Sequence, residues 1–162
     1  MYEHRDEFYS IYGERDVKRK IQNVWGGGAN RFVNKEGDQL VLDKKGFKRY
    51  VKRMEKANVD GWEDIASGAE MMNAEKLGDW KTYIALGTER IRQGKVSDLL
   101  LYNWGLRVNK QCKDKALRLL AAQWFDDAEV KAAKNEVEGK GNMMSYRTFF
   151  EKLAKDLKAD VQ

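Results

Sequence analysis

Residue types that constrain or cross-link a fold are scarce in this sequence. Proline is absent, and there is one cysteine, Cys112, and one histidine, His4. A single cysteine excludes an intrachain disulfide, and the lack of proline favours long helices joined by short turns over a loop-rich all-β chain. No apolar run approaches the roughly 20 residues that span a bilayer, and the first seven residues lack the apolar stretch of a signal peptide.

Recognisable catalytic and metal-binding patterns are also missing. His4 cannot form a zinc site by itself, since zinc takes three or four convergent ligands, so we expect an exposed side chain. The segment 26–30 (GGGAN) lacks the spacing of a phosphate-binding loop and follows a helix rather than a strand, so we predict a helix break. Flanking lysines could favour the thiolate of Cys112, but a lone cysteine is predicted to be inert. We therefore expect no enzyme activity, no cofactor and no metal.

Neighbouring carboxylates do not converge on a site. The pairs Glu63–Asp64 and Asp126–Asp127 are adjacent in sequence, so their side chains point about 100° apart on a helix. Both pairs are interpreted as solvated faces.

Apolar residues recur at helical spacing along most of the chain. Phe47, Tyr50, Val51 and Met54 lie at i, i+3, i+4 and i+7, which is the core stripe of an amphipathic helix. Similar stripes predict further helices, about seven in all, and 162 residues favour one domain. We predict a single all-α domain over 1–162, with N-terminal helices and a connector at 1–58 and helix hairpins at 59–162. Whether 1–58 forms a separate lobe stays open.

Short connections predict that consecutive helices after Asp60 pack as antiparallel hairpins. The helices of Trp62 and Trp80 would form one hairpin, and those of Trp104 and Trp124 would form another about 36 residues later, close to the ~34-residue tetratricopeptide period. We therefore predict a degenerate tetratricopeptide-like α-α superhelix. Each of the five tryptophans is expected to pack in the core.

Two further segments carry local signals. The segment Leu40–Leu42 favours an extended conformation but has no obvious partner strand, so it is interpreted as a connector that ends at Asp43, a candidate N-cap. The helix that contains Leu101, Trp104 and Val108 is also apolar at other positions, so it is predicted to be buried on several sides.

Three scattered segments resemble a known family. They are 8–13 (FYSIYG) followed by Val17 and Ile21, 78–83 (GDWKTY) and 99–104 (LLLYNW). Together they resemble the helical region that follows the catalytic domain in some bacterial envelope thioredoxin-like proteins.

The resemblance implies a tetratricopeptide-like tail that serves as an interaction or scaffold module. Its partner would be a protein or peptide, including an upstream redox domain of the same polypeptide. The compartment would be the periplasm or cell envelope, with the signal sequence and redox domain preceding Met1. Without the resemblance, a cytoplasmic protein is expected. No redox activity is implied, because Cys-x-x-Cys is absent.

The alternative function is nucleic-acid binding. The chain has 31 basic and 26 acidic residues, mostly interspersed, for a net charge of +5. One basic stripe stands out on the Phe47–Met54 helix, and such a stripe can neutralise phosphates or simply face water. Its members are Lys44, Lys45, Lys48, Arg49, Lys52, Arg53 and Lys56.

Overall fold

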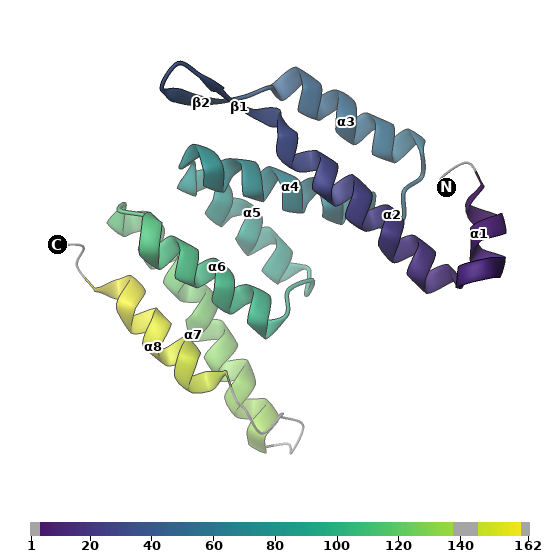
Figure 1. The fold of residues 1–162 in the computed structure, drawn as a ribbon. Coiled ribbons are helices and arrows are strands. Elements are labelled where there is room, and N and C mark those ends of the chain that lie inside the picture. Colours follow the sequence, from purple (N-terminus) through teal and green to yellow (C-terminus); the bar gives the residue numbers. More distant parts are fainter. Residues whose placement is uncertain (1–3, 138–145, 160–162) are drawn as a thin grey trace. The chain divides into compact units, whose positions relative to one another are not determined.

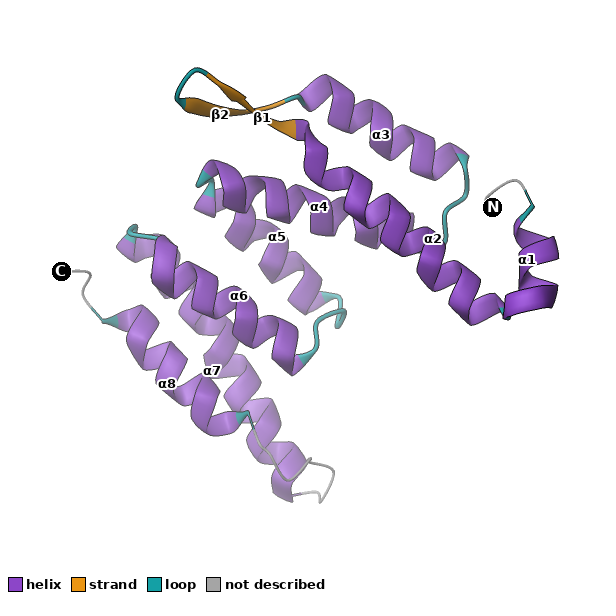
Figure 2. Ribbon diagram, in the orientation of Figure 1, coloured by secondary structure: helices purple, strands orange, loops and turns teal. Residues whose placement is uncertain are grey.

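The structure is a computed structural model that describes residues 4–137 and 146–159. Its elements are helices with one small sheet (Figure 1, Figure 2). They are α1 (Arg5–Tyr12), α2 (Glu14–Gly28), the 3-10 helix η1 (Ala29–Phe32), β1 (Val33–Glu36), β2 (Gln39–Leu42), α3 (Lys44–Lys56), α4 (Trp62–Leu77), α5 (Trp80–Arg92), α6 (Asp98–Gln111), α7 (Lys115–Val137) and α8 (Arg147–Lys158). The predicted all-α class is confirmed.

The chain divides into two compact units, Met1–Leu77 and Gly78–Gln162. The boundary follows Leu77 rather than residue 58, because α4 packs on α2, α3 and η1. The helices of Trp62 and Trp80 therefore belong to different units. That the two units form one domain, and that their helices form a tetratricopeptide-like superhelix, stay predictions.

Unit 1 is built on a shared core between α2, α3 and α4. Buried side chains from each helix meet there, and aromatic residues of η1 and α3 pack around them. The core residues are Val17, Ile21, Ala29, Tyr50, Met54, Val59 and Ala69. The apolar stripe predicted for α3 supplies Tyr50 and Met54, so the expected spacing is confirmed for this helix.

The interpretation of Leu40–Leu42 as an unpaired connector was wrong. It lies in β2, which pairs antiparallel with β1 from Val33↔Leu42 to Glu36↔Gln39. The two-residue turn is Gly37-Asp38, and Gly37 adopts a φ of +61°, which glycine tolerates without strain. The first strand escaped detection because three of its four residues are polar. Asp43 does cap α3, since its carboxylate accepts a hydrogen bond from the Gly46 N–H at 2.8 Å.

The helix break predicted in segment 26–30 falls at the third glycine. Helix α2 continues through Gly26 and Gly27 and ends at Gly28, where η1 begins. A Cβ on Gly26 or Gly27 would meet nothing within 4 Å, whereas a Cβ on Gly28 would overlap the Tyr50 hydroxyl. Only the third glycine is therefore required by packing.

Unit 2 centres on α7, which packs against α5, α6 and α8. The predicted pairing of the Trp104 and Trp124 helices is confirmed, because their indole rings lie 6.3 Å apart in an edge-on arrangement. The Trp124 indole N–H also donates to the Thr88 hydroxyl of α5 at 2.9 Å. Phe125 and Phe150 join α7 to α8 at a ring distance of 5.5 Å.

Burial of the aromatic and leucine-rich segments differs in part from expectation. Trp104 and Trp124 are buried, but Trp25, Trp62 and Trp80 are only half-buried. Helix α6 is not buried on several sides, since Leu99 is 57% and Leu106 is 40% exposed. No helix within the described ranges is both long and apolar enough to cross a bilayer.

Candidate functional site: a basic face on α3

The basic residues predicted on α3 all lie at the exposed surface. The Asp43 cap begins the helix, and burial of Tyr50 and Met54 fixes its orientation, so the charged positions point away from the core. Among the described residues, none of these cations forms an ion pair with a carboxylate. We call this surface the α3 basic face; its members are Lys44, Lys45, Lys48, Arg49, Lys52, Arg53 and Lys56. Their binding role stays a prediction.

Positive charge is far more concentrated on α3 than the composition indicates. The helix has seven basic residues and one acidic residue, Glu55, for a net charge of +6. The remaining 24 basic and 25 acidic residues of the chain leave a net charge of −1. The basic excess is therefore blocked rather than interspersed, and counting charge by helix would have shown this from the sequence.

An open cleft of about 360 Å³ lies beside the basic face. Three arginines from two elements line it: Arg31 comes from η1, and Arg49 and Arg53 lie one turn apart on α3. The other lining residues are Phe32, Asp43, Gly46 and Tyr50. Arg31 was missed because no local pattern marks it, and only the packing of η1 against α3 brings it to this cleft.

Arg31 is held in a defined orientation. Its Nε–H donates to the Gly28 carbonyl oxygen at 2.9 Å, and its guanidinium lies 5.5 Å from the centre of the Tyr50 ring. A cation over an aromatic face is attracted by the ring quadrupole. The two contacts fix the orientation of the guanidinium, which lines the cleft.

Tyr50 forms the wall between the cleft and the core of unit 1. Its hydroxyl donates to the Trp25 carbonyl oxygen at 2.6 Å. Burial raises the pKa of this phenol above its usual range, and a hydrogen bond with Arg31, together with the Arg31 and Arg53 charges, opposes the shift. Tyr50 therefore stays neutral near pH 7 and acts as a structural donor rather than as an acid or base.

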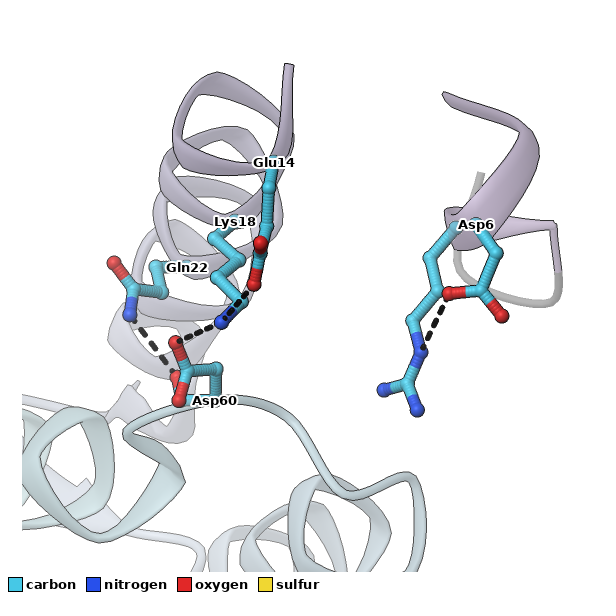
Figure 3. Close-up of polar contacts among 6 residues, drawn as sticks. Asp6, Glu14, Lys18, Gln22 and Asp60 are labelled. Carbon is cyan, nitrogen blue, oxygen red and sulfur yellow. Dashed lines mark hydrogen bonds and ion pairs between the residues drawn. The ribbon is translucent and has the colours of Figure 1, made fainter. Parts of the chain in front are cut away.

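A second, polar cleft of about 290 Å³ lies near the start of α2. Lys18 lies between Glu14 and Asp60 (Figure 3). Its Nζ is 2.6 Å from a carboxylate oxygen of Glu14 and 3.7 Å from one of Asp60. The Gln22 side-chain amide donates to the Asp60 carbonyl oxygen at 3.1 Å. The hydrogen bond with Lys18 and its charge lower the pKa of Glu14, and Glu14 followed by Asp60 raises the pKa of Lys18. Both groups therefore stay charged near neutral pH and are poorly suited to proton transfer. The network joins α2 to the turn before α4.

An apolar groove of about 250 Å³ lies on unit 2 between α6 and α8. It is lined by Leu99, Tyr102, Tyr146 and Phe149. Phe149 is 46% exposed. The Tyr102 ring lies 5.6 Å from that of Phe149 and 6.4 Å from that of Tyr146.

In the part of the chain that the structure describes, the other residues considered in the sequence do not form a binding or catalytic site with one another. Cys112 is buried, and burial raises the pKa of its thiol, so the proposed effect of its flanking lysines does not prevail. His4 is exposed as expected and lies 3.2 Å from Glu7. Asp126 is not simply solvated, because its carboxylate accepts hydrogen bonds from Lys158 of α8 at 2.8 Å. Within residues 4–137 and 146–159, no three His, Cys, Asp or Glu side chains are placed to share a metal ion.

Comparison with known proteins gives no family. The chain matches no protein-family model, no curated protein and no solved structure. What the chain does must therefore follow from the chemistry of the basic face, its arginine cleft and the apolar groove.

Proposed function

We propose that this chain is a non-catalytic helical interaction or scaffold module. The observation that supports this most directly is the apolar groove of unit 2. Leu99 and Phe149 expose 57% and 46% of their surface there, beside two tyrosines. Large apolar side chains that remain accessible in a groove are typical of surfaces that bind a protein or peptide. The expected partner is a segment that inserts an aromatic or aliphatic side chain between α6 and α8.

The resemblance to thioredoxin-like proteins extends this proposal. The chain would then be the tail of an exported protein in the periplasm or cell envelope, with an upstream redox domain as one partner. The mass of the native polypeptide in its source cells tests this extension. A species well above 18.8 kDa that contains a redox domain would support it, and a free-standing protein of that mass would contradict it.

Peptide selection tests the groove itself. A random 12-residue peptide library selected on the wild-type protein should enrich peptides with aromatic or leucine side chains. Binding should be lost in the variant Leu99→Ser/Phe149→Ser. The matched control is Leu119→Ser/Leu120→Ser, which removes two exposed leucines of α7 that do not line the groove. Failure to select any binder, or equal binding by both variants, would contradict the proposal.

The charge concentration on α3 favours a second candidate, a nucleic-acid-associated protein. Lysines and arginines that neutralise phosphates release counterions, so affinity falls steeply with salt. A labelled 20-nucleotide single strand should bind at low salt. The variant Lys44→Gln/Lys45→Gln/Lys48→Gln/Lys52→Gln should flatten the slope of log affinity against log salt by about 0.7 for each phosphate that is no longer neutralised. No binding at low salt would remove this candidate.

A further inference from the structure

The arginine cleft of unit 1 differs from the rest of the basic face in its geometry. Lys48 and Lys52 stand on the same helix but do not line the cleft. Arg49 and Arg53 line it from one side, and Arg31 is oriented by its backbone bond and the Tyr50 ring. Three guanidiniums from two elements therefore surround one open volume.

The charges around this volume are not balanced by the protein. Arg31, Arg49 and Arg53 have no ion pair to any described carboxylate. Among the described residues, the one carboxylate that lines the cleft belongs to Asp43, and it already accepts the Gly46 N–H as the helix cap. Three cations and one anion leave the cleft with an excess of positive charge.

Guanidinium groups suit one ligand chemistry particularly well. The planar fork of N–H donors matches the oxygens of a phosphate, and such charge-assisted bonds are about twice as strong as neutral ones. Lysine offers only a point charge. Arginines inside the cleft and lysines outside it are the distribution expected when one phosphate is bound specifically and others are neutralised nearby.

We propose that the cleft formed by Arg31, Arg49 and Arg53 binds a phosphate group, carried by a free ion, a nucleotide or a nucleic-acid strand. The Arg49 and Arg53 side chains bind its oxygens from α3, and the Arg31 guanidinium binds from η1. The site does not depend on the apolar groove, and it does not require the α3 basic face to bind a long polymer.

Amide and arginine Nε–H NMR shifts of the full chain provide the first test. Inorganic phosphate, AMP and a 12-nucleotide single strand are titrated separately against sodium chloride at matched ionic strength. Phosphate should shift signals of Arg31, Arg49 and Arg53, and chloride should not. If phosphate and AMP bind but the strand does not, the site is supported and its ligand is a small molecule. Tighter binding of the strand would support the site and identify nucleic acid as the source. Absence of phosphate-specific shifts would overturn the proposal.

Two charge-matched variants separate the cleft from the general basic face. Arg49→Gln/Arg53→Gln and Lys48→Gln/Lys52→Gln each remove two charges at i, i+4 spacing from exposed positions of α3. The arginine pair should weaken phosphate binding about tenfold or more, because charge-assisted bonds are lost, and the lysine pair about threefold or less. Equal losses would show that charge alone attracts the anion and would overturn the proposal.

The variant Asp43→Asn should change phosphate affinity in the opposite direction. Asparagine caps helices as well as aspartate does, so α3 should keep its stability while the cleft loses the Asp43 carboxylate. Phosphate affinity should rise severalfold. An unchanged or lower affinity in a folded variant would contradict a ligand that sits in this cleft.

Discussion

Arg118 of unit 2 and the three cleft arginines of unit 1 are used in opposite ways. In unit 2, Arg118 is buried and donates four hydrogen bonds to oxygens near the ends of α6 and α8. Its acceptors are the Asn109 carbonyl and side-chain oxygens and the carbonyls of Asp156 and Leu157. In unit 1, Arg31, Arg49 and Arg53 are exposed and have no ion pair within the described residues.

The difference shows what distinguishes a structural cation from a binding one. The guanidinium of Arg118 has five N–H donors, and the helix ends occupy most of them. A positive charge near the carboxyl ends of two helices is also favoured by their dipoles. The cleft arginines of unit 1 use few of their donors internally. Accessible donors, rather than charge, make the unit 1 arginines candidates for binding.

Replacing Arg118 is the strongest test of this contrast. Arg118→Met should lower the free energy of unfolding by about 3 kcal/mol, because several buried or partly buried oxygens lose their donor. Arg49→Met in α3 is the matched control and should change it by less than about 0.5 kcal/mol. Urea unfolding followed by far-UV circular dichroism measures both. If the two variants unfold alike, the contrast between the units fails.

Two adjacent glycines provide a sharper test within unit 1. Gly28→Ala should destabilise the protein by about 1–2 kcal/mol, because its Cβ would displace the Tyr50 hydroxyl. Gly27→Ala should instead stabilise it by up to about 1 kcal/mol, since this helical position has free space around it. The same urea titration should therefore give shifts of opposite sign. Shifts of the same sign would show that the α2–α3 packing is not as described.

The smallest expected effect concerns Tyr50. Tyr50→Phe should cost about 1 kcal/mol at neutral pH, through loss of the hydrogen bond to Trp25. Because burial raises the folded pKa above the ordinary tyrosine value of about 10, folding favours the protonated phenol. That preference contributes fully to the free energy of unfolding below about pH 10, and its contribution is lost as pH rises through the folded pKa. The stability difference between wild type and Tyr50→Phe should therefore shrink above about pH 10; a constant difference would contradict the raised pKa.

Sequence patterns predicted the helices better than the segments that connect them. The 3.6-residue period located α3, and the side-chain chemistry of Asp43 identified its cap, because both signals are local. The hairpin β1–β2 was missed because its first strand is mostly polar, so no alternating pattern marked it. The helix break was predicted in the right segment but not at its residue, because glycine propensity is a weak term: α2 continues through Gly26 and Gly27 and ends at Gly28.

The candidate site was predictable only in part. The lysines and arginines of α3 follow directly from helical spacing. Arg31 does not, because it is 18 residues before Arg49 in sequence and reaches the cleft only through the packing of η1. The apolar groove was missed for a related reason: a helical stripe identifies Phe149 as apolar, but the stripe cannot show that its neighbours leave it uncovered.

Cys112 makes the protein suitable for measuring the local opening of unit 2. It is the only cysteine in the sequence, it is 2% exposed, and it lies where α6 passes into α7. A thiol-specific reagent cannot reach the sulfur until this junction opens, so its labelling rate reports how often that happens. A ligand that binds and rigidifies the α6–α8 groove should slow labelling, whereas a ligand confined to unit 1 should not. One natural thiol can thus reveal which surface a partner occupies.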